Sequence, residues 1–383
     1  MLGKRNILLV TSMYPTLDPE YQASPICHYF ATQWKKMGYN VRVAHLCNSL
    51  PVVYSWVAKL FGNYGMKRMW SVSFLKPNRK KAKYEIEGIP VIYIPVTHAI
   101  PHIEPSFFRN ERAYKFLSSI LKEEGFAPDY IIAHWHSMAY YMPFFKKEFP
   151  YVKTSVVLHN SVTYNKRFHS VFDSVDTWGF RSNSIKNSFE ATYGKQIREF
   201  ICLSGVPSEY VPIQCPNKDF SRGINRFVYV GSLLKLKNID ITIRALSEYY
   251  KGSDFTFDVV GDGSEMASLK ALANDLGVKN NIIFHGRLPR DKAQIFVENA
   301  QVFIMVSSPE AFGLVYVEAM AKGCIPVATV GQGADGFVLD GKNGFLCTPK
   351  DVDALRSVIQ KICAMDPVQL SLLSKMHTIL LRI

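Results

Sequence analysis

The 383-residue sequence contains no uninterrupted apolar run of about 18 residues, which is the length that a membrane-spanning helix requires. It also contains no low-complexity tract. The apolar run near the N-terminus, within residues 6–15, is too short for the core of a signal peptide and is typical of a buried strand. We therefore expect no spanning helix and, at most, a peripheral contact with a membrane.

Paired cysteines are also missing. The seven cysteines are scattered without a regular spacing, and their number is odd. A disulfide framework would need an even set of cysteines, so we expect free thiols in a reducing compartment. The sequence thus predicts a cytoplasmic protein, either dissolved there or held at the inner face of a membrane.

Positive charge is concentrated in one half of the chain. Residues 1–200 contain 26 lysines and arginines against 14 acidic residues, whereas residues 201–383 contain 19 against 18. A basic half suggests an anionic partner, such as a membrane surface or a phosphorylated lipid, although it is equally compatible with a solvated surface. Nucleic acid is another anion, but we do not expect it as a partner.

Strands and helices alternate along both halves. The first half begins with a strand within residues 6–15, and a helix, a stop at Gly38 and a second strand follow within residues 28–45. In the second half, strands are expected at 226–232, 255–263, 280–288 and 301–308, and helices at 239–251, 264–277 and 290–300. This alternation predicts an α/β fold with two doubly wound domains.

Proline, glycine and serine mark the boundary between the expected domains. We assign an N-terminal domain, a linker, a C-terminal domain and a final C-terminal segment. Their bounds are residues 1–205, 206–225, 226–365 and 366–383.

Histidines follow two expected strands of the first half. His134 and His136 end the segment 127–137, and His159 ends the next strand. Ligands of open α/β sheets collect at the carboxyl ends of strands, so these side chains are site candidates. A metal would need a third ligand at suitable spacing, which is missing, so we expect no metal. His159 is equally compatible with a buried core histidine.

Two carboxylates stand out in the largely apolar stretch 307–329. Glu310 precedes an expected helix that starts near Gly313, and Glu318 lies on that helix. The amides at a helix start bind phosphate, and a carboxylate accepts two hydroxyl hydrogen bonds. Together they could hold a ligand about as long as one nucleotide-sugar. The alternative is that Glu310 caps the helix and Glu318 is a surface residue.

Two other acidic patterns have simpler explanations. Asp351 and Asp353 resemble a metal-binding pair, but their position before an expected helix favours a helix cap. The segment 261–263 follows a strand as a dinucleotide-binding loop would. It lacks the third glycine and the distant acid, so it is weak evidence for a nicotinamide cofactor, and we expect none.

The stretch 307–329, with its two glutamates, resembles the signature of family 4 retaining glycosyltransferases. Residues 227–246, 258–288 and 331–349 resemble three further blocks of that family, in the same order. The resemblance covers roughly residues 226–360 and is looser over the first half. It implies the GT-B fold, in which two Rossmann-like domains face a central cleft. The N-terminal domain would then bind the acceptor, the C-terminal domain would bind the nucleotide-sugar, and residues 366–383 would form a shortened helix that could return toward the first domain.

The resemblance also implies roles for single residues. Glu318 would hold the ribose of the donor, Glu310 would contact the transferred sugar, and Lys237 would neutralise the diphosphate leaving group. His134 would lie beside the reacting carbon, near the acceptor. The other donor-binding positions are expected at Ser232, Lys235, Arg287, Phe312, Gly313 and Leu314.

The implied activity is transfer of a hexose from a UDP- or GDP-sugar to a lipid-linked or glycan acceptor, with retention of configuration. The setting would be the assembly of a bacterial surface polysaccharide. The basic, aromatic segment 67–83 is a candidate for docking on an anionic bilayer, although it could equally be a solvated loop and helix face.

Several positions depart from the family pattern. Ser232 stands where the family usually has arginine, and Lys235 cannot reproduce the two-pronged contact of a guanidinium. The late block has Ala334-Asp335-Gly336 where a glutamate is common, and the loop within residues 11–30 lacks paired glycines. Two alternatives therefore stay open: a nucleotide-sugar epimerase or related enzyme on the same scaffold, and a catalytically weakened protein that binds nucleotide-sugars.

Overall fold

The chain forms two compact units. Unit 1 comprises Met1–Arg181 with Ile185–Cys202, and unit 2 comprises Ser182–Ser184 with Leu203–Ile383. The computed structural model describes residues 4–17, 25–49, 81–97, 106–206, 211 and 217–380.

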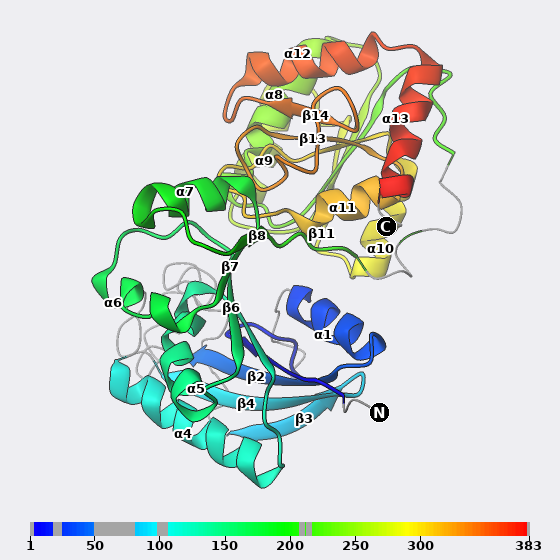
Figure 1. The fold of residues 1–383 in the computed structure, drawn as a ribbon. Coiled ribbons are helices and arrows are strands. Elements are labelled where there is room, and N and C mark those ends of the chain that lie inside the picture. Colours follow the sequence, from blue (N-terminus) through cyan, green and yellow to red (C-terminus); the bar gives the residue numbers. More distant parts are fainter. Residues whose placement is uncertain are drawn as a thin grey trace, which may run out of the picture. The chain divides into compact units, whose positions relative to one another are not determined.

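Unit 1 is built on an eight-stranded sheet with the order β3-β4-β2-β1-β5-β6-β7-β8 (Figure 1). All neighbouring strands are parallel except β3 and β4, which form an antiparallel hairpin at one edge. The strands are β1 (Asn6–Thr11), β2 (Asn40–Ser49), β3 (Ala82–Ile86), β4 (Ile89–Thr97), β5 (Tyr130–His134), β6 (Lys153–Leu158), β7 (Thr177–Phe180) and β8 (Glu199–Ile201).

Helices cover both faces of this sheet, α1 on one and α4 and α5 on the other (Figure 1). The predicted stop after the first helix is confirmed, because Gly38 has a φ of 93°, which glycine adopts without strain. The helices of this half of the chain are α1 (Ile26–Lys36), α4 (Phe107–Glu123), η1 (His136–Tyr141), α5 (Met142–Glu148), α6 (Lys166–His169), η2 (Phe172–Ser174) and α7 (Asn183–Tyr193).

The basic segment 67–83 lies largely outside the described residues, which resume at Lys81. The ammonium of Lys81 lies 3.5 Å from the centre of the Phe116 ring. The following hairpin turns at Glu87 and Gly88, whose φ angles of 50° and 72° match the two-residue turn that suits twisted strands. Sequence patterning did not predict this hairpin.

Unit 2 contains a fully parallel six-stranded sheet with the order β11-β10-β9-β12-β13-β14. All four strands expected in 226–308 are present, each shorter than the apolar run that predicted it. The strands are β9 (Arg226–Val230), β10 (Thr256–Val260), β11 (Ile282–Gly286), β12 (Val302–Ile304), β13 (Ile325–Thr329) and β14 (Phe345–Cys347).

The helices of unit 2 also lie on both faces of the sheet, with α8, α9 and α12 on one side and α10, α11 and α13 on the other (Figure 1). The three predicted helices match α8, α9 and α10 closely. The helices are η4 (Lys235–Lys237), α8 (Ile239–Tyr250), α9 (Met266–Asp275), α10 (Arg290–Asn299), α11 (Leu314–Ala321), α12 (Val352–Cys363) and α13 (Pro367–Leu380).

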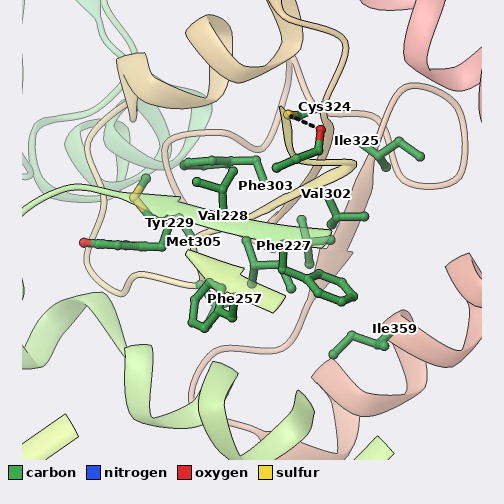
Figure 2. Close-up of a cluster of buried hydrophobic side chains, with 14 of the residues drawn as sticks. Phe227, Val228, Tyr229, Phe257, Val302, Phe303, Met305, Cys324, Ile325 and Ile359 are labelled. Atoms are coloured by element: carbon green, nitrogen blue, oxygen red, sulfur yellow. Dashed lines mark hydrogen bonds between the residues drawn. The ribbon is translucent and has the colours of Figure 1, made fainter. Parts of the chain in front are cut away.

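The strands at the centre of unit 2 are apolar because helices cover both faces of the sheet. Figure 2 shows side chains from β9, β10, β12, β13 and α12 meeting there. Phe227 and Phe303, on the neighbouring strands β9 and β12, are at most 1% exposed. This rigid layer fixes the positions of the loops that follow the strands.

Hydrogen bonds define the start of α12 and the packing of α13. Asp351 caps α12 by accepting a hydrogen bond from the amide of Ala354 at 2.9 Å, so the cap interpretation of this acid is confirmed. Helix α13 packs against α11, and the Ser374 hydroxyl donates to the carbonyl of Gly323 at 2.7 Å.

Within the described residues, no helix combines the length and apolar character needed to cross a bilayer.

Candidate functional site

The order of strands marks one particular place in the unit 2 sheet. From β9 the chain builds outward to β10 and β11, and it then returns to β12 on the other side of β9. Open α/β sheets bind ligands at the carboxyl ends of the strands where the order changes direction in this way. Lys237 follows β9 and Glu310 follows β12, so the topology brings both predicted residues to this point.

An ion pair joins these two loops. The ammonium of Lys237 lies 2.6 Å from Oε2 of Glu310, and both side chains are largely shielded from solvent. The Ser307 hydroxyl donates to the same carboxylate oxygen at 3.0 Å. A shielded ion pair with further hydrogen bonds holds its geometry better than an exposed pair.

Asn238 anchors the loop that carries Lys237. Its backbone is left-handed, with a φ of 50°, and its side-chain amide donates to the carbonyl of Val306 at 2.8 Å. The amide of Ser308 also donates to the carbonyl of Leu236 at 2.8 Å. These two bonds hold the loops after β9 and β12 side by side, which keeps Lys237 within reach of Glu310.

A third loop, which follows β13, fixes the backbone at Glu310. The amide of Glu310 donates to Oε1 of Gln332 at 2.9 Å, and the amide of Gly333 donates to the carbonyl of Glu310 at 2.8 Å. A Cβ added to Gly333 would lie 2.3 Å from the backbone nitrogen of Phe312, so only glycine allows this close approach. The contacts of Gln332 and Ser307 with Glu310 could not be predicted from the sequence.

Glycines after β10 lie equally close to the loop after β9. A Cβ on Gly261 would lie 1.8 Å from the carbonyl oxygen of Gly231, and one on Gly263 would lie 2.2 Å from that of Leu233. Gly261 also has a φ of 146°, in the region that favours glycine. These glycines let the backbone of residues 231–234 rest directly on the neighbouring loop.

Helix α11 begins at the predicted place. Gly313 precedes its first residue with a φ of 75°, and no side chain caps this end of the helix. The alternative in which Glu310 caps the helix is therefore wrong. The first amides of a helix have no partner within the helix and carry partial positive charge, so the end at Leu314 is suited to an anion. Phe312 itself is buried and packs against Phe337.

Glu318 is buried rather than on the surface, which excludes the second alternative. It is 7% exposed, it forms an ion pair with Arg290, and it accepts a hydrogen bond from Nε2 of Gln294 at 3.0 Å. Burial raises the pKa of the Glu318 carboxyl, and the Arg290 guanidinium opposes this rise. The sequence predicted a ligand for Glu318 but not these two partners on α10.

The other predicted donor contacts lie in the loops after β9 and β11. Ser232 is exposed, and its carbonyl accepts a hydrogen bond from the Tyr229 hydroxyl at 2.9 Å. Lys235 shares the turn η4 with Lys237, but its ammonium lies 3.3 Å from a carboxylate oxygen of Asp240. Arg287 directly follows β11.

The unit 1 sheet has its own change of direction, between β1 and β5. Thr11 and His134 are the last residues of these strands and are paired in register. His134 is 1% exposed, and Nδ1 of its ring lies 2.8 Å from Nε2 of His159. The topology therefore places His134 where the sheet would bind a ligand, whereas His136 lies in η1. No group of three candidate metal ligands occurs among the described residues.

Part of the second unit is similar to known protein sequences. Residues 216–374, less than half of the chain, match the family described as glycosyl transferases group 1. A GDP-mannose-dependent alpha-(1-6)-phosphatidylinositol monomannoside mannosyltransferase of Mycolicibacterium smegmatis is 34% identical over 148 residues, which are 37% of this chain and 38% of that protein. An uncharacterized glycosyltransferase of Methanocaldococcus jannaschii is 27% identical over 70% of this chain and 74% of its own.

Solved structures are similar over nearly the whole chain. The lipopolysaccharide outer core galactosyltransferase WaaB superposes with a TM-score of 0.68 and 17% identity, over 99% of this chain and 100% of WaaB. Anabaena HepE in complex with UDP gives 0.69 and 17%, over 99% and 94% of the two chains. At 17% identity this similarity shows only the fold. It is the predicted GT-B fold with two Rossmann-like domains.

Proposed function

We propose that this protein is a retaining glycosyltransferase that moves a hexose from a nucleoside-diphosphate sugar to a lipid-linked or glycan acceptor. The observation that carries the proposal is the Lys237–Glu310 pair at the change of direction of the unit 2 sheet. A cation and a carboxylate at this place match the two halves of such a donor, because one half is a diphosphate and the other a polyhydroxylated ring.

The diphosphate is assigned to Lys237 and the start of α11. Sugar transfer leaves negative charge on the departing nucleoside diphosphate. Donors that are already oriented toward this charge lower the barrier without having to reorganise. The Lys237 ammonium and the amides near Gly313 and Leu314 supply such donors, since a helix start binds phosphate.

The hydroxyl groups are assigned to the two carboxylates. Each ionised carboxylate accepts hydrogen bonds through two oxygens and therefore matches a pair of neighbouring hydroxyls. Glu310 lies beside Lys237 and is assigned to the transferred sugar. Glu318 lies further along α11 and is assigned to the ribose. Arg290 and Gln294 oppose the rise in the pKa of the buried Glu318 carboxyl and hold it in place.

The acceptor is assigned to unit 1, with His134 near the reacting carbon. The mycobacterial relative acts on a phosphatidylinositol mannoside and WaaB on lipopolysaccharide, so a glycolipid or surface glycan is the acceptor class that these names support. The six cysteines within the described residues are free, which agrees with a cytoplasmic site of action.

The donor assignment predicts a specific thermal response. Among UDP-glucose, UDP-galactose, GDP-mannose and NADH, we expect only nucleotide-sugars to raise the unfolding temperature. A ligand present at a hundred times its dissociation constant adds about 2.7 kcal/mol of stability. Glu318→Gln should weaken this stabilisation, because an amide cannot accept two hydroxyl hydrogen bonds through paired oxygens.

A control variant and an analysis of the reaction products complete this test. Glu265→Gln, at a partly exposed carboxylate before α9, should respond like the unchanged chain. With a radiolabelled donor, the label should move to a lipid or glycan fraction. An isomerised free nucleotide-sugar would instead support an epimerase. No response to any nucleotide-sugar would contradict the proposal.

We also infer that unit 1 binds anionic membranes through the start of α4. Phe107 and Phe108 are 57% and 79% exposed, and Arg112 and Lys115 are exposed on the following turns. The first turn of α4 contains no acidic residue, and cations near a helix start oppose its dipole. Two exposed aromatic rings beside exposed cations, of which Lys115 also forms an ion pair with Glu111, suit the boundary between headgroups and acyl chains.

Sedimentation with vesicles tests this surface. The chain should bind vesicles of phosphatidylcholine with phosphatidylglycerol, and the double variant Phe107→Ser/Phe108→Ser should lose at least about tenfold in affinity. Each buried phenyl group is worth about 1.5–3 kcal/mol, and 1.4 kcal/mol is a factor of ten. The control Val368→Ser/Leu372→Ser removes similarly exposed side chains from α13 and should bind unchanged. Equal binding by both double variants would refute this surface.

A further inference from the structure

Two buried imidazoles face each other at the carboxyl edge of the unit 1 sheet. His134 ends β5, His159 directly follows the neighbouring strand β6, and these strands pair in register up to His134 and Val157. The two rings are 1% and 5% exposed, and Nδ1 of His134 lies 2.8 Å from Nε2 of His159. This contact is a hydrogen bond between two side chains of the same chemical type.

Such a bond requires a single proton between the two nitrogens. A neutral imidazole carries its proton on only one ring nitrogen, so the role of Nδ1 dictates the role of Nε2. If His159 donates, Nε2 of His134 carries a proton; if His159 accepts, Nε2 of His134 is bare. The partner of Nδ1 therefore decides whether the rest of the His134 ring donates or accepts.

The surroundings keep both rings neutral. Burial, and to a lesser extent the Arg181 cation, lower the pKa of His134 to about 3. Burial also lowers the pKa of His159 well below its usual value, with His134 and Arg181 acting in the same direction. Two cysteines that face Arg181, Cys27 and Cys202, have thiols whose pKa is raised by burial, so they add no charge.

Trp135 holds the ring of His159 in place. Its indole stacks on His159, with ring centres 4.0 Å apart and planes inclined by 23°. Its backbone has a φ of 83°, a left-handed conformation that is strained for a side chain of this size, and its amide donates to the carbonyl of Val157 at 2.9 Å. Strain of this kind costs about 1–3 kcal/mol and is concentrated at functional sites.

We propose that His159 is a positioning residue that holds the buried His134 in one neutral tautomer. His159 thereby gives Nε2 of His134 a fixed hydrogen-bonding role toward the substrates. The inference rests on the proposed function only where it concerns substrates, because the tautomer itself is a property of the chain. Sequence analysis left His159 undecided between a core residue and a site residue, and the geometry assigns it to the site through His134.

Nitrogen NMR of the full-length chain with ¹⁵N-labelled histidine tests the tautomer. In the unchanged chain at neutral pH, His134 should show one protonated and one bare ring nitrogen with well-separated shifts. His159→Phe keeps an aromatic ring against Trp135 but removes the hydrogen bond, so the two shifts of His134 should move toward each other. His159→Gln can still bond to Nδ1 and should keep them apart. The control is His169→Phe at an exposed histidine on α6.

Kinetics with the donor that stabilises the chain best complete the test. We expect His159→Phe to lower kcat by about tenfold to a hundredfold, with little change in KM for the donor and partial recovery in His159→Gln. Unaltered His134 shifts in a folded His159→Phe variant would overturn the inference, whatever the activity. If the shifts respond but no donor binds or reacts, the inference about the tautomer stands and the proposed function fails.

Discussion

Replacing Lys237 with methionine is expected to lower the rate of sugar transfer by about a hundredfold to a thousandfold. Methionine keeps the length of the side chain but removes the charge that stabilises the departing diphosphate, and the loss of one such donor has an effect of this size in other enzymes. Glu310→Gln should have a comparable effect, because Lys237 and Ser307 then lose the carboxylate that both contact. The measurement is initial rate against donor concentration.

The two substitutions should not be additive. Residues that act as a unit lose most of their effect when either one is removed, so the double variant should be little slower than each single variant. Lys279→Met, at an exposed lysine beyond α9, is the control for the loss of a positive charge and should keep the full rate. If Lys237→Met retained a third or more of the rate, the assignment of the diphosphate would be refuted.

Gly261→Ala is expected to destabilise unit 2 by about 3 kcal/mol or more. The added Cβ would lie 1.8 Å from the carbonyl oxygen of Gly231, and a backbone atom cannot swing aside as the end of a flexible side chain can. Forced overpacking in a well-packed region costs about 1–3 kcal/mol, and the φ of 146° adds backbone strain. Differential scanning calorimetry should record a loss of about 6 °C or more in the transition of this unit.

Gly277→Ala is the matched control. Gly277 also has a positive φ, of 72°, but no atom lies within 4 Å of an added Cβ. It should therefore show only the left-handed backbone cost of about 1–2 kcal/mol. Equal destabilisation by the two alanines would mean that the contact between the loops after β9 and β10 does not matter.

The elements of unit 2 could be predicted because their signals are local. Strands buried on both faces must be apolar along their length, and glycines mark the ends of several helices, so 226–308 revealed its alternation directly. The boundaries were less accurate, since an apolar run such as 301–308 continues into a buried loop beyond β12. The position of Glu310 before a helix and of Glu318 on it followed from the same patterning.

The partners of the site residues could not be predicted, because they are distant in sequence. Glu318 is joined to Arg290, 28 residues away, and His134 to His159, 25 residues away. These pairings depend on how strands are ordered in each sheet. The order cannot be derived from the strength of the individual strands.

The two sheets share no strand, and each contains its own change of direction. The loops after β9 and β12 and the residues around His134 therefore depend on the strand order of different sheets. On the proposed function, selection can exchange the incoming sugar and the molecule that receives it one at a time. A chain of this design can diversify by recombining halves, and chimeras joined near Cys202 would reveal how freely the halves combine.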